Sequence, residues 1–156
     1  REIKFVMKVF KINTDKLFTN ITKKINENLP KNFNGLAHIY TPHTTSCIFS
    51  LEDELLHLTD VRFFLDKMAP FHKDPEGDHK NIKYLHDLIS LRNDVPSDER
   101  VNGHSHIRSL LFSGEQMIPF KNGKLLTGKW KSLFFIELDP GRDREYYLNV
   151  LKTEEW

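Results

Sequence analysis

The spacing of hydrophobic residues changes along the chain and predicts both strands and helices. Every second residue from 3 to 9 is hydrophobic, the period-2 pattern of a half-buried strand. Between residues 17 and 29 a leucine or isoleucine recurs at every fourth position, which predicts one face of an amphipathic helix that ends at Pro30. Two further stretches, 36–40 and 45–51, are rich in β-branched and aromatic residues and predict strands.

The middle of the chain predicts two helices separated by a long polar segment. Hydrophobic residues at helical spacing occupy 58–68, and Pro70 ends that helix. Residues 71–103 are polar and predict mostly loop, with one short helix possible around 82–88. Loops of this length in compact domains are usually functional or disordered. A short apolar helical face then runs over 107–111.

The last third of the chain predicts strands. Residues 116–120 and 124–127 flank Asn122-Gly123, a strong signal for a tight hairpin because both turn positions need a positive φ. Residues 132–138 and 144–151 flank a second turn at 139–142. The order of these elements predicts an α+β fold with a largely antiparallel sheet.

Length and charge narrow the function classes. A chain of 156 residues is expected to be a single domain, 1–156. Its 23 Lys and Arg balance 22 Asp and Glu, so we expect neither a nucleic-acid nor a membrane partner. There is no apolar run of the roughly 18 residues that a span requires, and the first residues have no apolar segment, so we expect no signal peptide in them. A single cysteine excludes an intrachain disulfide, and a cytoplasmic location is expected.

The first candidate for chemistry is the hydroxyl-rich segment 40–46, which joins two predicted strands around His43. Threonine and serine hydroxyls beside free backbone N–H groups suit an oxyanion or a phosphate, and His43 could act as a base or a metal ligand. The alternative is that the hydroxyls satisfy the backbone of a turn and that His43 is a surface residue.

Two histidines, His104 and His106, form the second candidate. In an extended chain both would point to one face and could bind one metal ion. In a helix, residues two apart do not face each other. Because the apolar face from Ile107 predicts a helix here, we expect only one of them to join a given site; the alternative is a capped helix start with solvated histidines.

Three further features each have a functional and a structural interpretation. His86 precedes Asp87, which could orient it or could simply lie beside it on a helix surface. The acidic run 52–54 either takes part in catalysis or caps the helix that follows. The segment 128–131 either closes a pocket with Trp130 or blocks edge pairing with its lysines. The P-loop, GxGxxG, HExxH and GxSxG motifs are all missing, which excludes the common nucleotide-binding and hydrolase classes.

Several short motifs follow one another along the chain. The motifs are Pro42–Thr45 with Glu52 downstream, Asp60–Arg62, Tyr84–Asp87, Asn102–Leu111, Asn122–Trp130 and Phe134–Glu137. Each is weakly specific by itself. Together, and in this order, they make the chain resemble the YjbQ-like family of small, poorly characterised proteins over about residues 9–150.

The resemblance implies an α+β, β-sandwich-like fold with two or three helices that assembles as a homotrimer. It also implies a cleft near the subunit boundary that is lined by His43, His86 and His106, with Glu52 and Arg108 nearby. A divalent metal, zinc by preference, is expected at the three histidines. Weak thiamine-phosphate synthase activity is associated with the family, and that reaction would require cations to stabilise the leaving pyrophosphate.

The chain departs from the family pattern at three positions. Leu51 stands where the family usually has Asn, and Lys129 and Lys131 stand where it usually has Thr and Gln. If the usual side chains contact substrate, these changes alter specificity or abolish activity. The three histidines are retained, so we expect the site to be retained as well.

Two functions follow from these observations. The first is a metal-dependent enzyme, a transferase of the thiamine-phosphate synthase type or a hydrolase, that acts on a small phosphorylated or anionic substrate. Glu52 would transfer a proton and Arg108 would hold negative charge. The remaining expected substrate contacts are Thr44, Thr45 and Trp130. The alternative is a non-catalytic or regulatory module that binds a small anion in the same cleft.

Overall fold

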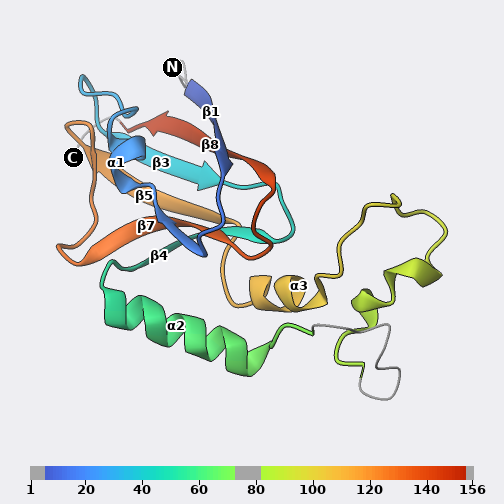
Figure 1. The fold of residues 1–156 in the computed structure, drawn as a ribbon. Coiled ribbons are helices and arrows are strands. Elements are labelled where there is room, and N and C mark those ends of the chain that lie inside the picture. Colours follow the sequence, from blue (N-terminus) through green and yellow to red (C-terminus); the bar gives the residue numbers. More distant parts are fainter. Residues whose placement is uncertain (1–5, 73–81, 154–156) are drawn as a thin grey trace.

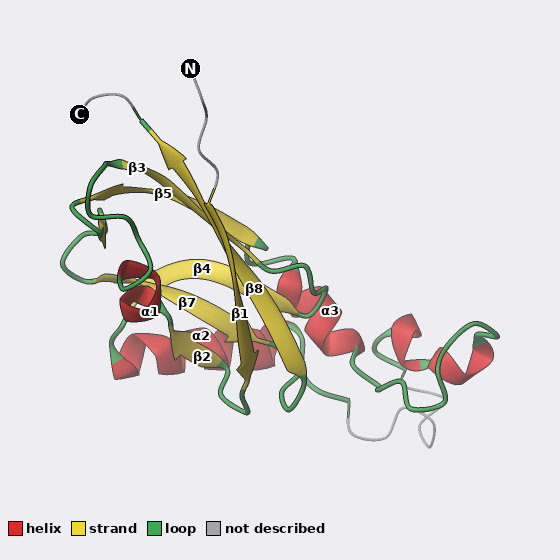
Figure 2. Cartoon of the chain, turned by 90° about the horizontal axis from the view of Figure 1, so that it is seen from above, coloured by secondary structure: helices red, strands yellow, loops and turns green. Residues whose placement is uncertain are grey.

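The computed structural model describes residues 6–72 and 82–153, which form two packed antiparallel sheets (Figure 2). The five-stranded sheet has the order β1-β8-β3-β5-β6, and the three-stranded sheet has the order β2-β7-β4. The strands are β1 (Val6–Asn13), β2 (Phe18–Asn20), β3 (Gly35–Tyr40), β4 (Ser46–Glu52), β5 (Glu115–Lys121), β6 (Lys124–Leu125), β7 (Lys131–Glu137) and β8 (Asp143–Lys152). All pairings are antiparallel, so the predicted α+β fold class is confirmed.

Three helices and two short 3₁₀ turns complete the fold of the described residues. They are α1 (Thr22–Asn26), α2 (Leu55–Met68), the turns η1 (Leu85–Asp87) and η2 (Ile89–Leu91), and α3 (Gly103–Ser109). Helix α2 covers the outer face of the small sheet, and α3 with the η turns lies at one end of the sandwich (Figure 1). In the described part of the chain, no helix has both the length and the apolar character that a membrane crossing requires.

The main core lies between the two sheets. Along β8 every second residue, from Arg144 to Val150, is buried, the alternation expected of a strand with one face against the core. Strand β7 is instead apolar on both faces, because α2 covers its second side. Phe135 faces the main core, while Phe134 packs in a second cluster with Leu65 of α2. Burial on both faces explains the continuous hydrophobic run in this strand.

The segment 17–29 differs from the single helix that its spacing predicted. Residues 18–20 pair with β7 as β2, and only residues 22–26 form α1. Ile21, Ile25 and Leu29 are nevertheless buried. The four-residue spacing therefore identified the buried positions correctly, but backbone pairing to β7 replaced the first helical turn.

The two predicted turns are present and have different roles. Asn122 (φ 53°) and Gly123 (φ 73°) form the tight β5–β6 hairpin as expected. The turn at 139–142 does not close a hairpin, because β7 belongs to the small sheet and β8 to the large one. This turn therefore carries the chain from one sheet to the other.

The acidic run before α2 caps the helix, one of the two roles considered for it. Glu54 accepts hydrogen bonds from the backbone N–H groups of Leu56 (2.7 Å) and His57 (2.9 Å). These bonds lower the pKa of Glu54, although the slight burial of the carboxylate opposes them. The start of α2 is thus fixed by a side chain whose residue type was visible in the sequence.

Candidate functional site

A pocket of about 240 Å³ lies where the β3–β4 loop, the segment 86–102, the start of α3 and the β7–β8 turn meet. We call it the His–Arg pocket. It is lined by Thr44, Thr45, His86, Ile89, Arg92, Val95, Glu99, Asn102, His106, Arg142 and Arg144. Its lining is thus rich in hydrogen-bond donors and contains two histidines.

Strand register brings the parts of this pocket together. Ser46, at the start of β4, pairs with Glu137, at the end of β7. Thr44 and Thr45 therefore lie beside the turn that leads to Arg142 and Arg144. The same end of the sandwich adjoins α3 (Figure 1), which supplies His106.

Arg144 is held from behind by a buried carboxylate. Its Nε and Nη2 donate to the two oxygens of Glu137 at 2.9 and 2.8 Å, and Nη2 also donates to Thr45 Oγ1 at 2.8 Å. The side chains of Arg144 and Glu137 are 6% and 0% exposed. Three charge-assisted bonds therefore fix the direction of this guanidinium before any ligand binds.

Arg142 is held by a second carboxylate, Asp139. Its Nε donates to Asp139 Oδ2 at 2.6 Å, and Asn102 Nδ2 donates to the same oxygen at 2.9 Å. Burial alone would raise the pKa of Asp139, but the hydrogen bonds from Asn102 and Arg142 outweigh it and lower that pKa. Asp139 is therefore ionised at neutral pH and anchors one side of the pocket.

His86 and His106 lie together in the pocket, with ring centroids 4.4 Å apart. Burial and the neighbouring His86 lower the pKa of His106, so its imidazole is neutral at pH 7 and can accept a proton. His104 lies on another side of α3, next to Arg108 and Asp66 in a separate hollow. The expectation that a helix would admit only one of the two histidines to a site agrees with this arrangement.

Besides His43, three of the predicted site residues lie outside the His–Arg pocket. Arg108 is buried and donates to the Ala69 carbonyl (2.8 Å) and to Asp66 (2.9 Å), so it joins α3 to α2. Glu52 pairs with Lys131 at the far end of β4, about 20 Å along the strand from Ser46 at roughly 3.3 Å per residue. Trp130, at the same far end, is 67% exposed. None of the three lines the His–Arg pocket.

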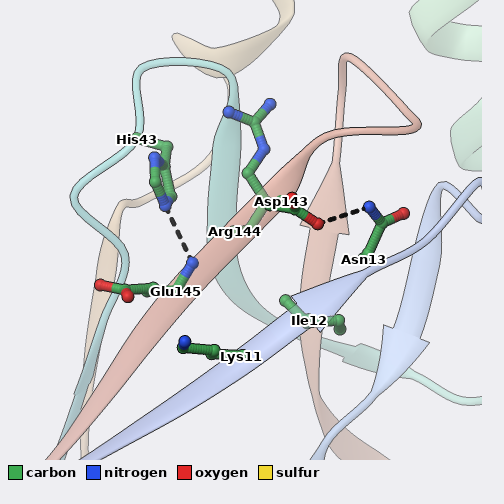
Figure 3. A pocket seen from close by; sticks show the side chains of 7 residues that line it. All are labelled: Lys11, Ile12, Asn13, His43, Asp143, Arg144 and Glu145. Carbon is green, nitrogen blue, oxygen red and sulfur yellow. Dashed lines mark hydrogen bonds between the residues drawn. The ribbon is translucent and has the colours of Figure 1, made fainter.

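His43 lies in a neighbouring hollow of about 500 Å³ that also contains Lys11, Asn13 and Glu145 (Figure 3). Its Nε2 accepts a hydrogen bond from the Glu145 backbone N–H at 2.9 Å. Burial and the charge of Arg144 lower the pKa of His43. The neutral ring therefore carries its proton on Nδ1, a tautomer inferred from the hydrogen bond. Arg144 borders both hollows.

The expected three-histidine metal centre does not fit the donor atoms of one chain. The described residues include no group of three or more His, Cys, Asp or Glu side chains arranged to hold a metal ion. A zinc ligand needs a free ring lone pair, whereas Nε2 of His43 is engaged by a backbone donor. A metal at His86 and His106 would require a rearranged His43 or a donor from a second subunit, and it stays a prediction.

Sequence patterns missed most of the charged residues of this pocket. Two acid–arginine pairs enclose Pro140-Gly141, one inside the other: Asp139 pairs with Arg142, and Glu137 pairs with Arg144. This nested order of two acids and two arginines around Pro140-Gly141 was the available signal. Asp87 makes no hydrogen bond to His86 among those of the described residues; its Oδ1 accepts the Gly103 N–H at 2.7 Å.

The lowered pKa of His106 predicts a pH-dependent stability. The ordinary pKa of a histidine is 6.5, so below pH 6.5 the unfolded chain binds a proton at His106 that the native chain binds less well. The free energy of unfolding therefore falls as the pH is lowered from 6.5 toward the pKa of His106 in the folded protein. His106→Gln is expected to lose less stability than the wild type between pH 7.5 and 5.5 in urea unfolding. Equal losses in the two proteins would contradict this linkage.

The chain is similar to proteins of one uncharacterised family. The family model "UPF0047 protein YjbQ-like" matches residues 8–153. A UPF0047 protein of Methanothermobacter thermautotrophicus is 32% identical over 75% of this chain and 68% of its own length. The UPF0047 protein YugU of Bacillus subtilis is 23% identical over 94% of this chain and 99% of its own length. The crystal structure of a YbjQ-like protein of unknown function from Sulfolobus solfataricus superposes on this chain with a TM-score of 0.75. The two sequences are 22% identical, and the match covers 97% of this chain and 100% of that one. The chain belongs to the YjbQ-like UPF0047 family.

Proposed function

We propose that the His–Arg pocket binds a small phosphorylated substrate and that the chain is an enzyme acting on it. The main support for this proposal is that Arg142 and Arg144 are each held in place by a carboxylate, Asp139 and Glu137 respectively. Both arginines line a pocket that is also lined by His86 and His106. Guanidinium groups match the geometry of phosphate oxygens, and prior orientation removes part of the entropic cost of binding.

The charges around the pocket favour a small ligand over a polymer. Glu137 and Asp139 neutralise much of the charge of the two arginines. An anionic ligand would therefore be held mainly by short, directed hydrogen bonds from the arginine N–H groups. A nucleic-acid surface would need an extended basic face, which these local pairs do not supply. The volume of about 240 Å³ suits a compact phosphate ester.

The pocket offers groups for proton transfer as well as for binding. Neutral His106 can accept a proton from an attacking group, and the arginines would stabilise negative charge that develops on the departing oxygen. The resemblance suggests one reaction to assay, the joining of a thiazole phosphate to a pyrimidine pyrophosphate. A phosphate-ester hydrolase is the second reaction class.

One observation favours the alternative of a non-catalytic anion-binding module. Glu52, expected to transfer a proton, lies at the far end of β4, and Glu99 is the carboxylate that lines the pocket. Turnover decides between the two functions. Loss of the bound phosphate ester over time supports the enzyme, and binding without any turnover supports the module.

Arg142→Ala is expected to weaken binding of pyrophosphate about tenfold or more, because it removes a charge-assisted donor from the pocket. Pyrophosphate should raise the thermal midpoint of the wild type through preferential binding to the folded state. Arg62→Ala is the control, since Arg62 is exposed and does not line this pocket. An unchanged affinity in Arg142→Ala would remove the support for the site.

The homotrimer and the metal are further parts of the proposal, and they rest on the resemblance. Sedimentation velocity would test the trimer, and elemental mass spectrometry of protein purified without chelator would test the metal. About one zinc or other divalent ion per chain, lost in His86→Ala, is the expected result. Metal-free protein after reconstitution would leave the histidines as acid–base groups.

A further inference from the structure

We infer that the substrate carries a hydrogen-bond donor, a hydroxyl or an N–H, next to its anionic group, and that Asn102 reads this donor. The inference rests on the proposed function and names the class of phosphorylated substrate. Its starting point is an unusual state of two polar atoms in residues that line the His–Arg pocket.

Asn102 has an orientation that its neighbours determine. The side chain is at the N-terminus of α3, is 3% exposed and donates from Nδ2 to Asp139. Asp139 is ionised and can only accept, so the amide cannot be reversed without placing two acceptors against each other. The amide oxygen, Oδ1, must therefore face away from Asp139.

This amide oxygen is buried and accepts no hydrogen bond from any described residue. The Nδ1 atom of His86, which lines the same pocket, is also buried and without a partner among the described residues. Buried polar atoms in native proteins nearly always have partners, and an unpaired one is costly. Two such atoms in residues of one pocket indicate where a bound molecule completes the hydrogen bonding.

The chemistry of the missing partner follows from what each wall of the pocket offers. Arg142 and Arg144 can only donate, and they match the oxygens of a phosphate. Asn102 Oδ1 can only accept, so a fully ionised phosphate leaves it unpaired. A molecule with a hydroxyl or amino group near its phosphate would satisfy both walls at once, whereas a simple alkyl phosphate would satisfy one.

A matched pair of ligands tests this inference with the unmodified protein. Glycerol 2-phosphate and isopropyl phosphate share a branched three-carbon skeleton and a phosphate, and only the first carries hydroxyl groups. By isothermal titration calorimetry, the wild type is expected to bind glycerol 2-phosphate about tenfold more tightly. In Asn102→Ala the two affinities should come within about twofold of each other. Asn28→Ala, outside the pocket, should keep the wild-type ratio.

The outcomes separate this inference from the proposed function. Equal binding of the two esters by the wild type overturns the inference and leaves the phosphate site in place, since an ordered water then satisfies Asn102. Failure of both esters and of pyrophosphate to bind overturns the proposed function and the inference with it. Should Asn102→Ala not fold, the comparison within the wild type still decides the question.

Discussion

Glu137→Ala is expected to lower the free energy of unfolding by about 3–5 kcal/mol, because it leaves the buried guanidinium of Arg144 without its counter-charge. The variant also removes the acceptor for the Asp139 backbone N–H, which Glu137 holds at 2.9 Å. Urea unfolding followed by circular dichroism measures the change. The loss is large because both partners are nearly inaccessible to water.

A matched pair of controls separates burial from simple charge loss. Asp94→Ala breaks the exposed ion pair with Arg92, whose side chains are 55% and 72% exposed, and should leave the urea midpoint nearly unchanged. Replacing Glu137 and Arg144 together by leucine should recover most of the stability lost in Glu137→Ala, because no buried charge is then unpaired. A Glu137→Ala loss no larger than that of Asp94→Ala would contradict the prediction.

Gly103→Ala is expected to destabilise the fold by about 1–3 kcal/mol and to abolish pyrophosphate binding. A methyl group at this position would lie 2.5 Å from Tyr84 Cβ and 2.7 Å from Asp87 Oδ1. It would also strain the 2.7 Å hydrogen bond by which the Gly103 N–H is held to Asp87. Since Gly103 directly follows Asn102 and begins α3, the displacement would spread to the pocket wall.

Gly128→Ala is the matched control for this prediction. A methyl group there would meet no atom within 4 Å, so stability and pyrophosphate binding should both be retained. Urea unfolding and the pyrophosphate-dependent thermal shift can be measured on the same samples. Full binding by Gly103→Ala would show that the start of α3 tolerates the added volume and that the pocket does not depend on close packing against Tyr84.

Local patterns predicted the elements of this fold well where one physical constraint dominates. The Asn122-Gly123 hairpin followed from the need for two positive φ angles, and both are observed. The helix predicted over 17–29 was too long, because a four-residue spacing of buried side chains also suits β2 followed by a short helix. Spacing reports which positions are buried, and tertiary pairing decides the backbone conformation.

The candidate site could be predicted only in part, and the reason is its construction. Motifs located His86, His106, Thr44 and Thr45, which all line the pocket. They could not place Arg142 or Arg144, because these residues are brought there by the crossing from one sheet to the other. The resemblance placed Glu52 near the histidines, whereas within one chain it lies about 20 Å from Ser46 along β4.

The crossing at residues 139–142 also restricts how this protein can tolerate insertions and deletions. Side chains alternate between the two faces of β8. One extra residue in the turn that shifted β8 by one position would exchange these faces, so that Arg144 would point outward and Tyr146 and Leu148 would be exposed. The proposed phosphate site and the fold would be lost together. Residues 92–101 belong to neither sheet and still supply Arg92, Val95 and Glu99 to the pocket. We therefore expect that changes in the length of this segment would alter the lining of the proposed site without loss of the fold.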